Sequence, residues 1–152
     1  MHIKCTNTGN LSVSDLCLLD SILEWYNEDE SNVAKFVEVV KRKNGMSLRV
    51  IDWLVTNFSK VHSVAINSSG LPRDLNRDYQ MNLTAYNKKN MDPFARRNKI
   101  KIRVFGKDER SSTVGQLNFF RWYYKNDINV YLNKHRDVVE THMKENEGKE
   151  HI

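Results

Sequence analysis

Glycine and proline are scarce in this chain, and their scarcity restricts the fold. Only 6 Gly and 2 Pro occur among 152 residues, too few for an all-β sandwich or barrel that needs a tight turn after each strand. No apolar run approaches the roughly 18 residues that span a bilayer, and the N-terminus lacks the extended apolar core of a secretory signal. We therefore expect an intracellular, helix-rich protein with no contact to a membrane.

Cysteine is scarce as well. Cys5 and Cys17 are the only two cysteines and are widely spaced, which favours two free thiols over a disulfide framework or a metal site. His135 and His142 share a helix face but lie two turns apart, too far to chelate one ion directly. Nucleophile-elbow, phosphate-loop and zinc-protease motifs are all missing. We predict no catalytic residue, no metal and no cofactor, and consider an enzyme the weakest of three hypotheses.

Helical periodicity covers most of the chain. Apolar residues recur at intervals of three and four, and they predict helices over residues 12–28, 33–43, 47–60, 75–90, 117–125 and 128–142. Ser12 with Asp15, and Thr113 with Gln116, have the spacing of capping boxes at two of the helix starts.

Two segments have strand character. Residues 99–105 alternate between apolar Ile100, Ile102 and Val104 and the basic residues between them, so we expect a half-buried strand with a basic outer face. Residues 61–66 form a second short strand before a turn-rich loop at 67–72. The prediction is a mostly α (α+β) fold: one helix-rich domain, residues 1–145, with a two- or three-stranded β element and a frayed charged tail at 146–152.

Positive charge is concentrated in one segment. The net charge is +5, yet residues 86–107 alone hold eight Lys and Arg against the single Asp92, while the flanking parts are each slightly acidic. Lys and Arg that neutralise phosphates provide most of the non-specific affinity for nucleic acid, and interleaved aromatics can stack on bases. The candidate phosphate-binding residues are Lys88, Lys89, Arg96, Arg97, Lys99, Lys101 and Arg103. A solvated basic face balanced by acidic helices is the alternative.

The basic segment divides into two parts. The string 92–97, Asp-Pro-Phe-Ala-Arg-Arg, indicates a structured turn in which Phe94 anchors in the core, Asp92 pairs with an arginine and the arginines are partly structural. The strand that follows would then present Lys99, Lys101 and Arg103 as the more exposed surface.

An aromatic run at residues 119–124 suggests a different role. Six consecutive residues with five aromatic rings spread around the whole helix, which is typical of a central core helix. If one side is exposed instead, Trp122 and Tyr123 would form a partner interface. The alternative function is therefore a non-enzymatic structural or interaction protein that binds itself or another protein.

Three stretches, residues 48–60, 83–97 and 112–122, resemble a family of small proteins of unknown function encoded by nucleocytoplasmic large DNA viruses, the giant viruses. Asp-Pro-Phe-x-Arg-Arg at 92–97 and Gly-Gln-Leu-Asn-Phe-Phe-Arg-Trp at 115–122 are its most specific strings, and the similarity extends over about residues 46–145. The resemblance implies a host-cytoplasmic protein or one packed in virions, and it supplies no activity, cofactor or catalytic residue. The basic segment makes a nucleic-acid-binding accessory or virion-associated protein our first hypothesis, with DNA or RNA as the partner; the alternative is an oligomeric virion or capsid-associated component that binds itself or another viral protein. Ala95 stands where the family often has Cys, so this position is no essential thiol, which counts against a thiol-dependent mechanism.

Overall fold

The computed structural model describes residues 1–43, 45–68 and 70–147. Helices account for most of them, and the strands form two small antiparallel sheets. In chain order the elements are β1 (Ile3–Asn7), α1 (Val13–Asn27), α2 (Glu30–Val40), α3 (Leu48–Trp53), the π-helical η1 (Leu54–Phe58), α4 (Ser59–Val61), β2 (Ala65–Ser68), β3 (Leu71–Asp74), α5 (Leu75–Tyr86), the 3-10 turn η2 (Lys88–Asn90), β4 (Ile100–Val104), β5 (Asp108–Ser112), α6 (Val114–Lys125) and α7 (Ile128–Asn146). The predicted α+β class is confirmed.

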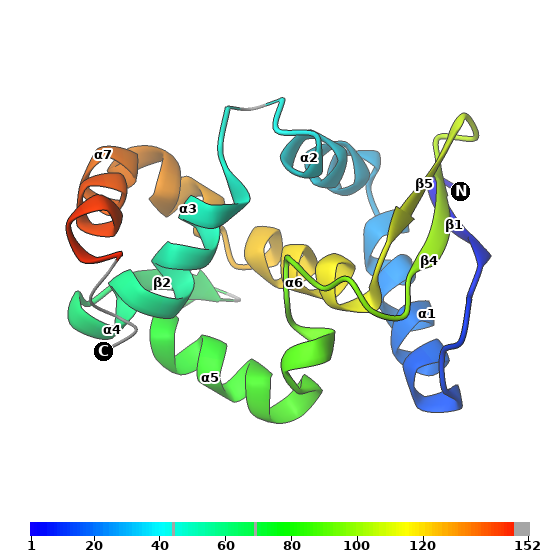
Figure 1. The fold of residues 1–152 in the computed structure, drawn as a ribbon, viewed down its shortest axis with the longest axis horizontal. Coiled ribbons are helices and arrows are strands. Elements are labelled where there is room, and N and C mark those ends of the chain that lie inside the picture. The colour runs from blue at the N-terminus through cyan, green and yellow to red at the C-terminus, as the bar shows by residue number, and fades with distance from the viewer. Residues whose placement is uncertain (44, 69, 148–152) are drawn as a thin grey trace.

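Helix α6 lies in the middle of the molecule and organises the packing. It separates α1, α2 and the three-stranded sheet on one side from α3, α5 and α7 on the other (Figure 1), and it packs directly against α1, α2, α7 and η2. Phe119 and Phe120 are fully buried, and Trp122 and Tyr123 are buried as well, so most rings of the aromatic run belong to the core. The core-helix interpretation of residues 119–124 is thus confirmed.

The first sheet has the strand order β1-β4-β5. In β4 the predicted alternation is confirmed, because Ile100, Ile102 and Val104 are buried while Lys101 is exposed. Both outer strands, β1 and β5, were missed by the sequence patterns. Strand β5 reads Asp-Glu-Arg-Ser-Ser and has no apolar alternation, so only its backbone pairing with β4 identifies it.

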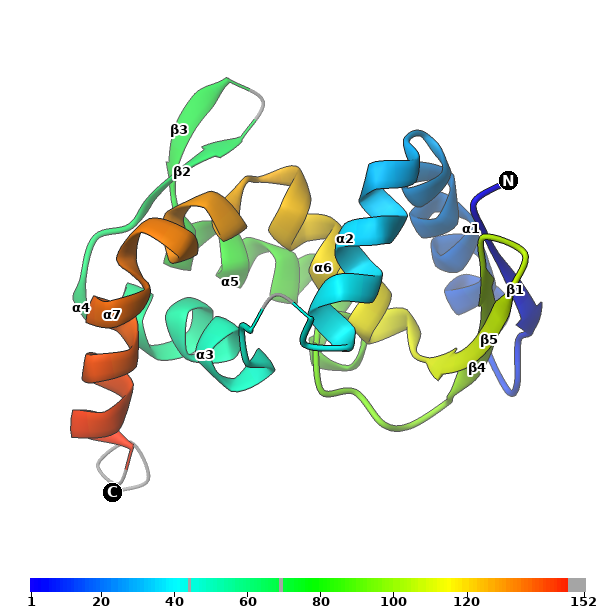
Figure 2. The ribbon, with the colours of Figure 1, turned by 90° about the horizontal axis from the view of Figure 1, so that it is seen from above.

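The second sheet corrects the prediction for residues 61–72. Its strands β2 and β3 form a hairpin in which Ala65 is opposite Asp74 and Ser68 is opposite Leu71, so most of the expected loop is paired strand. The hairpin extends away from α5 and α7 (Figure 2). Strand β3 is exposed throughout, and an exposed strand has no reason to show the alternation that would reveal it.

The helix predicted over residues 47–60 is present but widens in its middle. Hydroxyl groups of Thr56 and Ser59 hydrogen-bond to the carbonyls of Asp52 and Val55 at 2.7 and 2.6 Å, within or next to the π-helical turn η1. At the other end of the chain α7 continues to Asn146, and residues 148–152 of the predicted tail lie outside the described residues. No described helix is long and apolar enough to cross a membrane.

Candidate nucleic-acid interface

Four of the seven predicted basic residues surround one pocket. The pocket has a volume of about 540 Å³ and lies where the N-termini of α1 and α6 meet η2 and the connection from η2 to β4. Its basic lining residues are Lys88, Lys89, Arg96 and Arg97. The unpaired N–H groups at the start of a helix attract anions, so the first turn of α6 adds to the positive character of this pocket.

A glycine allows η2 to approach α6 this closely. A Cβ atom on Gly115 would lie 2.3 Å from the carbonyl oxygen of Lys89, which is less than any real contact of that kind. Next to it, the Asp92 N–H donates to the Gly115 carbonyl at 3.2 Å and the Gln116 amide donates to the Pro93 carbonyl at 3.2 Å. These contacts hold the basic connection against the start of α6.

A buried polar network supports the floor of the pocket. The Asn90 amide donates to Asp15 Oδ1 at 3.0 Å, and the Asn118 amide donates to the Asn90 carbonyl at 2.8 Å. The hydrogen bond from Asn90 lowers the pKa of the Asp15 carboxyl below its ordinary value; burial opposes this effect, while Lys89 and Ser12 add to it. The network therefore ties α1, η2 and α6 together around a carboxylate.

Ionic partners distinguish the two lysines from the two arginines. Lys89 Nζ lies 3.5 Å from Asp15 Oδ2, and Lys88 Nζ lies 3.9 Å from Asp92 Oδ1. Arg96 and Arg97 are exposed, and neither has an ion pair within the described part of the chain. An unpaired guanidinium pair at a helix N-terminus is available for bidentate contacts with phosphate.

The expected anchoring of the turn at 92–97 is wrong. The Phe94 side chain is 42% exposed and lines the pocket, whereas the buried apolar position next to the turn is taken by Met91. Asp92 Oδ1 accepts the Phe94 N–H at 2.9 Å and pairs with Lys88 instead of an arginine. This tight side-chain turn directs Phe94 out of the core and leaves the arginines free.

The prediction that the basic face of β4 is the more exposed surface is likewise not met, because two of its side chains have partners on the sheet. Arg103 is half-buried and pairs with Glu109 at 3.5 Å across the sheet, and Lys101 Nζ donates to Ser111 Oγ at 2.8 Å. A hydrogen bond from Thr6, followed by the nearby Arg103, lowers the pKa of Glu109. Lys99 is exposed and precedes β4. The seven predicted residues thus form a pocket group of four, Lys99 next to it, and two side chains with partners on the sheet.

The proposed partner interface at α6 is also corrected. Trp122 and Tyr123 are 6% and 3% exposed, and the Trp122 indole donates to buried Asp78 at 2.7 Å. Both side chains face into the domain because α6 is packed on several sides, so they present no surface to a partner. Within the described residues, no three His, Cys, Asp or Glu side chains gather in a way that could hold a metal ion.

Comparison with known proteins agrees with the resemblance noted from the sequence strings. A family of unknown function, DUF7197, matches residues 2–151. An uncharacterised protein of Acanthamoeba polyphaga mimivirus is 28% identical over 153 residues, which cover 95% of this chain and 59% of that relative. The chain therefore spans a little over half of the relative's length. No solved structure matches the chain.

Proposed function

Since the chain belongs to the DUF7197 family of unknown function, its function has to be inferred from its own residues, and we propose that it is a nucleic-acid-binding accessory or virion-associated protein. The observation that carries this proposal is the pair of exposed arginines, Arg96 and Arg97, at the mouth of a basic pocket without ionic partners among the described residues. When the two guanidinium groups bind phosphates, they replace the counter-ions of the nucleic acid, and the release of these counter-ions favours binding.

Phe94 favours single strands over duplexes. Its ring is 42% exposed at the pocket that holds the arginines, and an exposed ring next to cations is the arrangement on which unpaired bases stack. A duplex hides its base faces, so the ring would gain little from it. The pocket group supplies the phosphate contacts and Phe94 supplies the stacking contact.

Binding to a fluorescent single strand of about 12 nucleotides tests the proposal. With Lys88, Lys89, Arg96, Arg97 and Lys99 as phosphate contacts, the logarithm of affinity should fall with the logarithm of salt with a slope of about −3.5, because each contact contributes about 0.7 on single strands. Titrations with DNA, with RNA and with a duplex of equal length decide which nucleic acid is preferred.

Two variants distinguish binding residues from structural ones. Arg96→Glu/Arg97→Glu should abolish measurable binding and leave the thermal unfolding curve unchanged, since both side chains are exposed and unpaired. Phe94→Ala should weaken single-strand binding about tenfold and duplex binding much less. Lys41→Glu/Lys43→Glu carries the same charge change on exposed residues after α2 and should bind nearly as well as the wild type. If both double variants weaken binding equally, only general charge is involved and the pocket proposal fails.

A further inference from the structure

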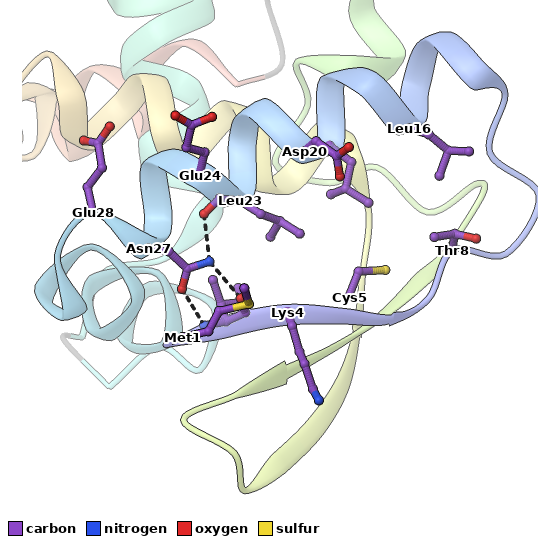
Figure 3. A pocket seen from close by; sticks show the side chains of 12 residues that line it. Met1, Lys4, Cys5, Thr8, Leu16, Asp20, Leu23, Glu24, Asn27 and Glu28 are labelled. Carbon is purple, nitrogen blue, oxygen red and sulfur yellow. Dashed lines mark hydrogen bonds between the residues drawn. The ribbon is translucent and has the colours of Figure 1, made fainter.

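A second hollow, away from the basic pocket, follows the free edge of the three-stranded sheet. It has a volume of about 680 Å³ and lies between β1 and α1. Leu16 and Leu23 project from α1 toward β1, and the Cys5 side chain points up to them from the strand (Figure 3). We name this hollow the β1 groove. Its floor is apolar, with Ile3 and Leu19 both buried at its base.

Strand β1 has an unpaired side along this groove. The sheet order β1-β4-β5 places β1 at an edge, with no strand beside it among the described residues. The His2 carbonyl faces β4, where it accepts the Phe105 N–H at 2.7 Å, while the Ile3 N–H faces the groove. Because backbone groups alternate along an antiparallel strand, the N–H and C=O of Cys5 face the groove as well.

One side chain already occupies this edge as a neighbouring strand would. Asn27 Oδ1 accepts the Ile3 N–H at 2.9 Å, and Asn27 Nδ2 donates to the Ile3 carbonyl at 2.9 Å (Figure 3). A side-chain amide carries the same donor and acceptor as a peptide group. Asn27 therefore closes one end of the edge, and the next groove-facing residue, Cys5, remains open to a peptide.

Acidic residues form the rim of the β1 groove. Asp20 and Glu24 on α1 and Glu28 just after its end follow one another at intervals of four, and all three line the groove and are exposed. The carboxylates of Glu24 and Glu28 point to the outer side of α1, away from β1 (Figure 3). None has an ion pair within the described residues. Like charges at this spacing repel each other, and carboxylates in the last turn oppose the helix dipole. The row therefore destabilises the C-terminal part of α1, and a bound cationic ligand would remove this electrostatic repulsion.

We propose that the β1 groove binds an extended, lysine- or arginine-containing segment of a partner protein, which adds a strand to the edge of β1. Backbone groups of the segment pair with Cys5, alternate apolar side chains enter the floor between β1 and α1, and its long cationic side chains reach over α1 to Asp20 and Glu24. A second copy of this chain fits less well, because symmetric pairing of two β1 edges would bring two acidic rows together.

Fluorescence anisotropy with a peptide of about eight residues, alternating lysine and valine, tests the proposal on the full chain. The same peptide with alternate backbone nitrogens methylated cannot donate to the strand edge and should bind at least about tenfold more weakly. A glutamate–valine peptide should bind more weakly still, because its charge matches that of the rim.

Charge-reversal variants locate the binding site. Asp20→Lys/Glu24→Lys should weaken binding of the lysine peptide at least about tenfold, whereas Asp137→Lys/Glu145→Lys, the same charge change on exposed residues of α7, should leave it unchanged. Equal binding of the methylated peptide, or equal loss in both variants, would overturn strand addition at β1. A stable dimer in light scattering that excludes the peptide would assign the groove to a second copy instead.

Discussion

Asp15 illustrates how a single residue performs two structural tasks. Its backbone N–H donates to the Ser12 hydroxyl at 3.1 Å, as the capping pattern predicts. Its side chain also accepts the Asn90 amide across 75 positions of sequence. The same carboxylate lies 3.5 Å from Lys89. Asp15 therefore takes part in the cap of α1 and also fixes η2, the turn that carries two lysines of the pocket.

Removal of the Asp15 carboxylate should destabilise the protein. Asp15→Ala leaves the buried Asn90 amide without its partner and should cost about 2 kcal/mol in the free energy of unfolding. Urea unfolding at neutral pH measures this difference. Asp20→Ala removes an exposed carboxylate of the same helix and should change stability by less than about 0.5 kcal/mol. Equal effects of the two substitutions would mean that the Asn90 contact contributes nothing.

The contribution of Asp15 also has a predictable pH dependence. Its pKa is lower in the folded state than the ordinary value of 3.8, so the unfolded chain takes up the proton first as pH falls. The stabilisation is complete above that ordinary value and is lost as pH falls through the lower, folded-state pKa. The stability gap between the wild type and Asp15→Asn should therefore narrow only in strongly acidic solution.

At the scale of elements, the pocket depends on how closely η2 and α6 pack. Gly115→Ala places a Cβ atom 2.3 Å from the Lys89 carbonyl oxygen, and relief of this clash requires η2 or α6 to move. We expect a loss of about 3 kcal/mol in stability together with weaker nucleic-acid binding, because Lys88 and Lys89 move with η2. Lys125→Ala, an exposed substitution in the same helix, is the control. An unchanged melting temperature for Gly115→Ala would contradict the packing described for η2.

Elements differ in how far the sequence alone predicts them. Helix α6 is predicted well, since Thr113 accepts the Gln116 N–H as the capping pattern requires. Strand β4 is predicted because burial of one face imposes its alternation. Strands β1 and β5 are stabilised mainly by backbone pairing to β4, for which side chains give no signal.

In the candidate site, likewise, the sequence predicts some features and not others. The clustering of Lys88, Lys89, Arg96 and Arg97 in sequence indicated the basic surface, because neighbours in sequence stay neighbours in space. The partners of these residues could not be inferred. Asp15 lies 74 positions from Lys89, and the turn at Asp92 that exposes Phe94 depends on a 2.9 Å contact within three residues. The freedom of the arginines and the pairing of Arg103 therefore emerge only from the fold.

Across the whole molecule, α1 connects two surfaces of opposite charge. Asp15 in its first turn lines the basic pocket, while Asp20 and Glu24, with Glu28 just after the helix, line the β1 groove. At 1.5 Å per residue, the thirteen positions from Asp15 to Glu28 span about 20 Å. The two proposed ligands would therefore bind at separate places and could bind at the same time. Each surface also repels the ligand of the other surface, because the two ligands have opposite charges.

The tyrosines link the buried core to the alkaline stability of the whole molecule. Burial raises the pKa of Tyr26, Tyr123 and Tyr124 well above the ordinary value of 10.0, and it raises the pKa of Tyr79 and Tyr131 as well. The unfolded chain therefore loses these protons near pH 10 while the folded chain keeps them. The stabilisation is complete below that pH, and it falls as pH rises further.

Tyr26→Phe isolates one of these protons. In the wild type the Tyr26 hydroxyl donates to the Leu117 carbonyl at 2.7 Å, so its loss should cost about 1 kcal/mol at neutral pH. Above pH 10 the unfolded variant has one ionising group fewer than the unfolded wild type. The free energy of unfolding should therefore fall less steeply with pH in the variant, and the two slopes should differ by about 1.4 kcal/mol per pH unit. Circular dichroism and tyrosinate absorbance, followed together in an alkaline titration, measure both effects. Because Tyr26 is fully buried, the tyrosinate absorbance that the wild type has and Tyr26→Phe lacks should appear together with the loss of helix signal. Its appearance in a fully helical protein would show that the core around α6 is accessible to water.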